Sequence, residues 1–131
     1  MSSMLQEEGA QDDVQVTWAD QQNINHFAKL NTAMSDMEEA YEEKKKEREY
    51  LEDLEMELEL ADEEDAVRYK IGDAFIHMSL DAAQERLTND KSELVADIEG
   101  LKTEMDSLQT EMEKLKKLLY ARFGKSINLE K

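Results

Sequence analysis

The side chains that could carry out acid–base or metal chemistry in this chain are few and scattered. His26 and His77 are the only histidines, and cysteine is absent. The run DEED at residues 62–65 gathers four carboxylates, but it lacks the spacing and the central glycine of an EF-hand loop. No HExxH motif, serine–histidine–aspartate arrangement or glycine-rich phosphate loop occurs. We therefore expect no catalytic residue, no metal site and no cofactor, with His26 on a helix surface and His77 half-exposed on a strand.

Composition and charge narrow the class of protein. Charged residues make up 37% and aromatic residues 6%, with four glycines and no proline. Such a mixture is typical of long helices where apolar residues are periodic, and of disorder where they are not. The net charge of −17 disfavours nucleic-acid binding, because phosphate contacts need a basic face. The chain has no run of about 18 apolar residues, so we expect no membrane span. The lack of cysteine and of a signal-peptide pattern favours a cytoplasmic or nuclear location.

Charge is also distributed unevenly along the chain. Residues 51–65 hold nine acids and no base, whereas residues 114–125 (KLKKLLYARFGK) hold five bases and no acid. The basic run fits a helix C-terminus whose cations complement the macrodipole. The acidic run fits a solvated face, and the alternative is a surface that repels or selects partners.

The first long helix should begin after an acidic tail. Residues 1–13 lack apolar periodicity and are expected to be disordered. Thr17 followed three residues later by Asp20 is a variant of the capping box that starts helices. We expect a helix over residues 17–61.

A second long helix should follow a short central segment. Ser79 is a suitable N-cap for a helix over residues 80–123, and Gly124 stands where a C-terminal cap glycine belongs. Residues 124–131 then form a tail. Residues 14–131 are thus expected to be a single, mainly α domain.

Apolar or long side chains recur along both helices at alternating steps of three and four, the repeat of a coiled coil. The first series is Phe27, Leu30, Met34, Met37, Tyr41, Lys44, Arg48, Leu51, Glu55 and Leu58, and the second is Leu80, Gln84, Leu87, Lys91, Leu94, Ile98, Leu101, Met105, Leu108, Met112, Leu115 and Leu119. We expect the helices to fold back on each other as an antiparallel coiled coil, with both termini at one end, the tip. Facing layers should be apolar toward the tip and mixed near the centre, where Leu51 would face Lys91 and Glu55 would face Leu87. The mixed half should be the weaker one.

The central segment, residues 67–78 (VRYKIGDAFIHM), is predicted to be a β-hairpin with Gly72 and Asp73 in a two-residue turn. The expected pairs are Val67 with Met78, Tyr69 with Ile76 and Ile71 with Ala74 on one face, and Arg68 with His77 and Lys70 with Phe75 on the other. A lone two-stranded hairpin is marginally stable and has two unpaired edges. We expect several chains to pool their hairpins in an oligomeric β-barrel; the alternative is that the hairpin folds onto its own helices. The residues expected to mediate oligomerisation, the hairpin set, are Val67, Tyr69, Ile71, Gly72, Ala74, Phe75, Ile76 and Met78.

Several apolar residues gather near the expected tip. They could form an exposed, flexible patch that binds apolar segments of other proteins, or they could cover the last helical turns. The residues of this candidate binding site, the tip set, are Trp18, Ile24, Phe27, Leu118, Tyr120, Phe123, Ile127 and Leu129.

The order helix, single hairpin, helix, with YKIGDAFIHMSLDAAQ at the join, resembles the β-type subunits of the prefoldin family. The α-type subunits have two hairpins, and this chain has no second β-rich stretch. The end motifs VTWADQQNINHFAKL and LYARFGKSINLE are similar to those of one eukaryotic β-type subunit. The resemblance covers nearly the whole chain after residue 13.

This resemblance implies a non-enzymatic co-chaperone. Prefoldin is a heterohexamer of two α-type and four β-type subunits, in which hairpins build a double β-barrel and coiled coils extend from it. The resemblance implies that the tips hold non-native proteins such as actin and tubulin and transfer them to the cytosolic group II chaperonin without ATP. Nucleic acid and membrane are not expected partners. The competing interpretation is a coiled-coil scaffold or adaptor protein with no chaperone activity.

Overall fold

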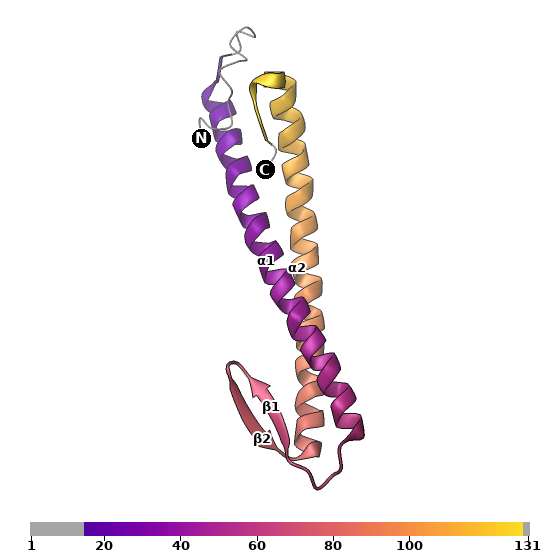
Figure 1. The fold of residues 1–131 in the computed structure, drawn as a ribbon. Coiled ribbons are helices and arrows are strands. Elements are labelled where there is room, and N and C mark those ends of the chain that lie inside the picture. Colours follow the sequence, from indigo (N-terminus) through magenta and orange to yellow (C-terminus); the bar gives the residue numbers. More distant parts are fainter. Residues whose placement is uncertain (1–14, 130–131) are drawn as a thin grey trace. The chain divides into compact units, whose positions relative to one another are not determined.

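The computed structural model describes residues 15–129, so the tail expected over residues 1–13 lies outside the described part. The chain is mainly α, with two long helices packed together and a central two-stranded antiparallel hairpin (Figure 1). The elements in order are α1 (Trp18–Leu60), β1 (Val67–Ile71), β2 (Ala74–Met78), α2 (Leu80–Phe123) and the short 3₁₀ helix η3 (Gly124–Ser126). The predicted fold class is confirmed.

Side-chain caps account for where the helices start. The backbone N–H of Asp20 donates to Thr17 Oγ1, and the N–H of Thr17 donates to Asp20 Oδ2, both at 3.0 Å. This reciprocal pair is the expected capping box. At the start of α2, the N–H of Ala82 donates to Ser79 Oγ at 3.2 Å, so Ser79 is the cap that the sequence predicted.

The chain divides into two compact units, each with its own core. The end unit comprises the described residues 15–39 and 103–129, and the hairpin unit comprises residues 40–102. In each unit a stretch of α1 packs against a stretch of α2. The buried core of the end unit is Ile24, Phe27, Leu30, Met34, Met112, Leu119, Phe123, Ile127 and Leu129, and that of the hairpin unit is Leu51, Leu54, Leu58, Val67, Tyr69, Leu80, Ala83, Leu87, Leu94 and Ile98.

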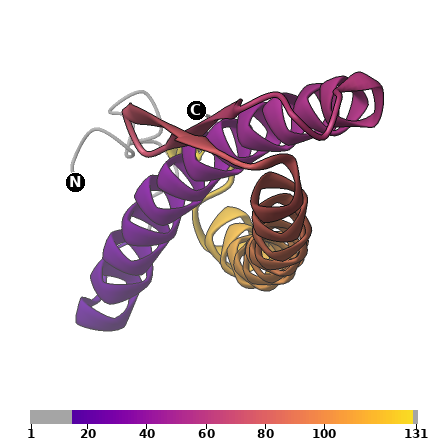
Figure 2. The same ribbon diagram turned by 90° about the horizontal axis from the view of Figure 1, so that it is seen from below.

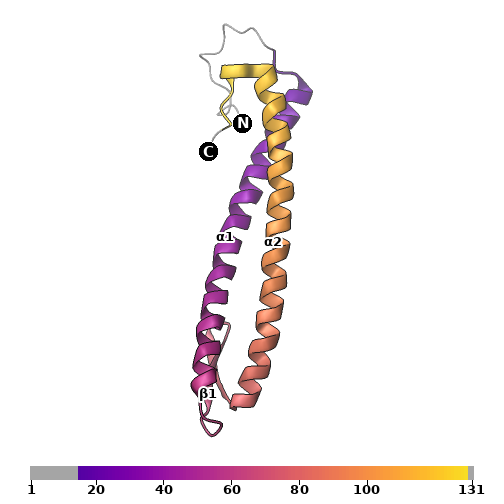
Figure 3. The ribbon, with the colours of Figure 1, turned by 90° about the vertical axis from the view of Figure 1, so that its right-hand side faces the viewer.

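The hairpin has the predicted register. Val67 pairs with Met78, Tyr69 with Ile76 and Ile71 with Ala74, and Gly72 has a φ of +62° in the turn, a conformation that glycine adopts without strain. The hairpin runs back alongside the start of α2 rather than projecting past the helix ends (Figures 1 and 3), and β2 leads into α2 (Figure 2).

The helix seam beside the hairpin differs from the expected one. Leu54 and Ala83 are buried, although neither belongs to the predicted series, while Gln84 is exposed. Lys91 donates a hydrogen bond to Glu55 on α1. The hairpin explains the change, because its buried side chains share one core with Leu54 and Ala83 and therefore draw different helix positions inward.

The hairpin unit nevertheless buries ten residues in one core, to which β1 contributes Val67 and Tyr69. The layers expected to be fully apolar near the middle of the helices are only half-buried. The residues concerned are Met37, Tyr41, Leu101, Met105 and Leu108. None of the helices within residues 15–129 is long and apolar enough to cross a membrane.

Candidate functional site

Strand β1 anchors the hairpin to the helices of its own unit. Tyr69 is fully buried and Val67 is 8% exposed. The Tyr69 hydroxyl donates to Asp90 Oδ2 at 2.9 Å, and Asp90 also accepts from Arg86 Nε at 3.2 Å. Burial, followed by the hydrogen bond to Asp90, raises the pKa of Tyr69, so the hydroxyl remains a donor. The alternative expectation, a hairpin folded onto its own helices, therefore describes β1.

Strand β2 presents side chains outward instead. Phe75 is 45% and Ile76 is 47% exposed, and they lie on opposite faces of the hairpin because successive strand residues alternate. The Arg68 guanidinium lies 4.0 Å from the centre of the Phe75 ring, within the range of a cation–π contact. Two exposed apolar side chains on one outer strand offer contacts to a further partner.

The predicted apolar face is thus divided between two environments. Its β1 side is docked on the helices, and its β2 side overhangs into solvent. Within the hairpin set, Val67 and Tyr69 are buried, Ile71 and Met78 are half-buried, and Gly72, Ala74, Phe75 and Ile76 are exposed.

The tip set is mostly buried, which corrects the expectation of one exposed apolar patch. Trp18 is 79% and Leu118 is 47% exposed, whereas Tyr120 is half-buried. The other five have exposed fractions of 3% or less and lie in the core of the end unit: Ile24, Phe27, Phe123, Ile127 and Leu129. The physical reason is that the chain folds back after Gly124 and lays its last apolar residues on the two helices. The alternative expectation, that these residues cover the last turns, holds for those five.

An ion pair joins the two helices in the end unit. Arg122 Nε donates to Asp20 Oδ1 at 2.8 Å, and Arg122 Nη2 donates to Asp20 Oδ2 at 2.5 Å and to the Gln15 carbonyl oxygen at 3.1 Å. The Asp20 side chain is 6% exposed and that of Arg122 is 41% exposed. The hydrogen bonds from Arg122 are the main cause that lowers the pKa of Asp20, despite the opposing effect of burial.

The sequence reasoning identified Asp20 only as a helix cap and missed its partner. A usable signal existed, because the expected register that puts Leu51 opposite Lys91 also puts Asp20 opposite Arg122 when it is continued toward the chain ends. Continuing that register would have predicted the pair.

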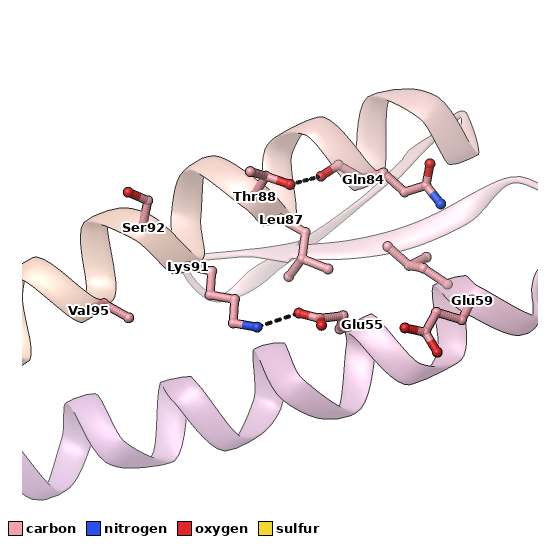
Figure 4. Close-up of a pocket in the computed structure, with 9 residues that line it drawn as sticks. Glu55, Glu59, Gln84, Leu87, Thr88, Lys91, Ser92 and Val95 are labelled. Atoms are coloured by element: carbon pink, nitrogen blue, oxygen red, sulfur yellow. Dashed lines mark hydrogen bonds and ion pairs between the residues drawn. The ribbon is translucent and has the colours of Figure 1, made fainter.

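A shallow groove of about 550 Å³ lies between α1 and α2 in the hairpin unit. Lys91 reaches across it from α2 and its Nζ donates to Glu55 Oε2 on α1 at 2.6 Å (Figure 4). This hydrogen bond raises the pKa of Lys91. Both side chains are about 40% exposed, so the pair contributes little to stability.

The histidines form no site together. His26 lies on the surface of α1 with its Nε2 2.6 Å from Glu111 Oε1, and His77 is exposed on β2. Across residues 15–129, no three histidine, aspartate or glutamate side chains converge in a group able to hold a metal ion.

Comparison with known proteins agrees with this architecture. The family model described as prefoldin subunit matches residues 21–126. Prefoldin subunit 4 of Saccharomyces cerevisiae is 38% identical over 124 residues, covering 95% of this chain and 96% of the relative. Prefoldin subunit 4 of Homo sapiens is 40% identical over 122 residues, covering 92% and 91%, and the probable prefoldin subunit 4 of Drosophila melanogaster is 37% identical over 119 residues, covering 91% and 86%. The chain therefore belongs to the prefoldin subunit family of non-enzymatic chaperones, as a β-type subunit related to prefoldin subunit 4.

Proposed function

We propose that this chain is an ATP-independent holdase subunit of a heterohexameric prefoldin with two α-type and four β-type subunits. It holds non-native proteins such as actin and tubulin and transfers them to the cytosolic group II chaperonin. It acts in the cytoplasm, with the nucleus as a second location. The observation that carries the proposal is the hairpin, which is anchored on one strand and offers two exposed apolar side chains on the other.

The hairpin set divides into two roles in this proposal. Val67 and Tyr69 hold the hairpin in place, because both are buried in the core of the hairpin unit. Phe75 and Ile76 supply apolar contacts for neighbouring hairpins, and the two-stranded sheet has outer edges to which further strands can add. A closed barrel built from the hairpins of several chains would cover both the exposed apolar side chains and the strand edges.

Replacing Phe75 by serine and Ile76 by threonine should abolish assembly while leaving the chain folded. Both side chains are nearly half exposed, so their loss removes little buried area from the chain itself. Mass measured in solution by light scattering after mixing with complementary α-type and β-type subunits gives the result. We expect a hexamer from the unchanged chain and unassembled subunit from the variant.

The matched control for this variant is Leu60→Ser, because Leu60 is 88% exposed at the end of α1, outside the hairpin. It should assemble normally. A hairpin variant that still forms the hexamer would contradict the assembly role. An unchanged chain that remains a monomer or a defined homodimer beside its partners would favour the scaffold interpretation instead.

The exposed members of the tip set are the first contacts for a client in this proposal. Trp18 and Leu118 belong to the end unit and keep large apolar areas in solvent. Aromatic and aliphatic anchors of this kind carry much of the affinity in protein interfaces.

Replacing Trp18 and Leu118 by serine should weaken client capture on the order of tenfold without changing the mass of the hexamer. The measurement is suppression of aggregation of chemically denatured actin diluted into buffer, titrated with the assembled complex. Met56→Ser is the control, because Met56 is 66% exposed but lies in the hairpin unit. Equal suppression by all three complexes would remove Trp18 and Leu118 from the client site.

A further inference from the structure

The last described residues of the chain fold back over the end unit. Gly124 ends α2 with a φ of +55°, η3 turns the chain, and Ile127 is extended with φ −125° and ψ 142°. Burial then alternates, because Ile127 and Leu129 are each 3% exposed whereas Asn128 between them is exposed. This segment crosses the end of α2 and turns back along the helices, in yellow in Figures 1 and 3. We call residues 124–129 the strap.

The two aliphatic side chains of the strap complete an apolar core that both helices supply. Ile24 and Phe27 of α1 and Leu119 of α2 are almost fully buried in the same cluster as Ile127 and Leu129. The helices alone would leave this cluster open on the side that the strap covers. The strap therefore fills an apolar groove of the end unit.

The contacts of the strap are of a kind that a competitor can replace. Two aliphatic side chains enter the groove, and the N–H of Leu129 donates to the Tyr120 hydroxyl at 3.3 Å, which is long for such a hydrogen bond. The strap is joined to α2 through Gly124, whose φ is +55°. Segments held by few buried apolar contacts open locally at a low free energy.

We propose that the strap is a built-in competitor for client, occupying in the free chain the groove that receives an extended segment of a non-native protein. This inference rests on the proposed function and names the client feature that this subunit would recognise. The feature is two aliphatic side chains two residues apart on an extended backbone. The strap itself is the argument for that occupant, because Ile127 and Leu129 present this pattern to the groove and it is the pattern of a β-strand.

The competition has a measurable consequence for affinity. For a ligand that binds only the open groove, the apparent dissociation constant equals the intrinsic one divided by the fraction of chains in which the groove is open. If the strap covers the groove about nine-tenths of the time, its removal should tighten binding about tenfold. Trp18 and Leu118 in the same unit are exposed while the strap is in place, so a client can make first contact there.

The direct test uses a fluorescent peptide that copies residues 124–131 (GKSINLEK). Its binding is measured by fluorescence anisotropy to two reconstituted complexes, one with the full chain and one with the chain ending at Gly124. We expect about tenfold tighter binding to the second complex, and no gain for a peptide with serine at the positions of Ile127 and Leu129. Equal binding to both complexes would overturn the proposal.

A full-length variant separates the loss of the strap from the loss of chain length. Ile127→Ser with Leu129→Ser should reproduce the gain in peptide affinity, whereas Lys125→Ser, at an exposed position of the strap, should leave it unchanged. Circular dichroism checks that α1 and α2 remain folded in each variant. An affinity gain with Lys125→Ser alone would contradict the role assigned to the two aliphatic side chains.

A measurement on the unmodified complex needs no variant. When denatured actin is added, amide exchange of Ile127 and Leu129 should speed up while exchange of Ile24 and Phe27 does not. Captured actin with an unchanged or slower exchange of the strap would overturn the competition. Failure to capture actin at all would instead refute the proposed function, and the peptide result would still decide whether the strap covers an accessible groove.

Discussion

Replacing Tyr69 by alanine should lower the free energy of unfolding by about 3–5 kcal/mol and free the hairpin from its helices. Tyr69 is the largest of the fully buried side chains in the described part of the chain. It shares the core of the hairpin unit with Leu80 and Ala83, and its hydroxyl reaches Asp90. Truncation leaves a cavity of ring size and removes the side chain that ties β1 to α2.

Tyr69→Phe is the matched control, because it keeps the ring and removes only the hydroxyl. Loss of the hydrogen bond to Asp90 should cost about 1 kcal/mol, since Asp90 keeps its contact with Arg86. Urea unfolding followed by circular dichroism gives the stabilities, and amide exchange over residues 67–78 reports hairpin release. Equal losses for the two variants would mean that the hydroxyl, not ring packing, holds the hairpin.

Local chemistry made much of this fold predictable. Thr17 and Ser79 are caps whose side chains act within one turn, and the pairing of Val67 to Ile71 with Ala74 to Met78 follows from a two-residue turn at Gly72. These features depend on neighbours in sequence. Alternation along the hairpin then sets which residues share a face, so the register was predictable without any tertiary contact.

Whether a given residue on a hairpin face is buried or exposed was not predictable in the same way. Tyr69 and Ile76 are opposite each other on one hairpin face, yet one is fully buried and the other is 47% exposed. The difference arises because β1 lies against the helices and β2 overhangs, and this depends on how the hairpin tilts as a body. Leu54 and Ala83 were also missed, and both lie in the core that includes the docked strand β1.

The sequence predicted which apolar residues gather at the candidate client site, but not which of them are buried. Apolar residues do collect in the end unit, as the sequence indicated. Periodicity cannot say, however, that Ile127 and Leu129 return to cover Ile24 and Phe27. That outcome depends on the turn after Gly124 and on the distance to the groove, which are properties of the folded chain.

Replacing Arg122 by alanine should destabilise the end unit more than replacing its partner, Asp20. Arg122 is 41% exposed and can reach water when its partner is lost, whereas the Asp20 side chain is 6% exposed and cannot. A carboxylate stranded in a buried site is the more damaging half of a broken pair. We expect the thermal midpoint of Arg122→Ala to fall by roughly 5 °C at pH 7, and that of Asp20→Ala to fall less.

The pH dependence tests whether a stranded charge is the cause. In the unchanged chain the folded-state pKa of Asp20 is lowered by Arg122, so the stability from this group is present above its unfolded pKa and is lost as pH falls through the folded value. In Arg122→Ala, burial without a partner should raise the pKa of Asp20 instead. The penalty is then largest at neutral pH and disappears as the carboxyl protonates, so the gap between the two chains should narrow from pH 7 toward pH 4.

The double variant Arg122→Ala with Asp20→Asn decides between a stranded charge and lost packing. Asparagine carries no charge to strand and keeps an oxygen that can accept the cap hydrogen bond from Thr17. The double variant should therefore be more stable at pH 7 than Arg122→Ala alone, although it carries one more substitution. Because asparagine does not titrate, residue 20 should add no recovery of stability to the double variant as the pH falls. If the double variant instead loses the sum of what the two single substitutions lose in stability, Arg122 acts by packing along the helix end. Only an unpaired carboxylate would make the substitution of Asp20 restore stability.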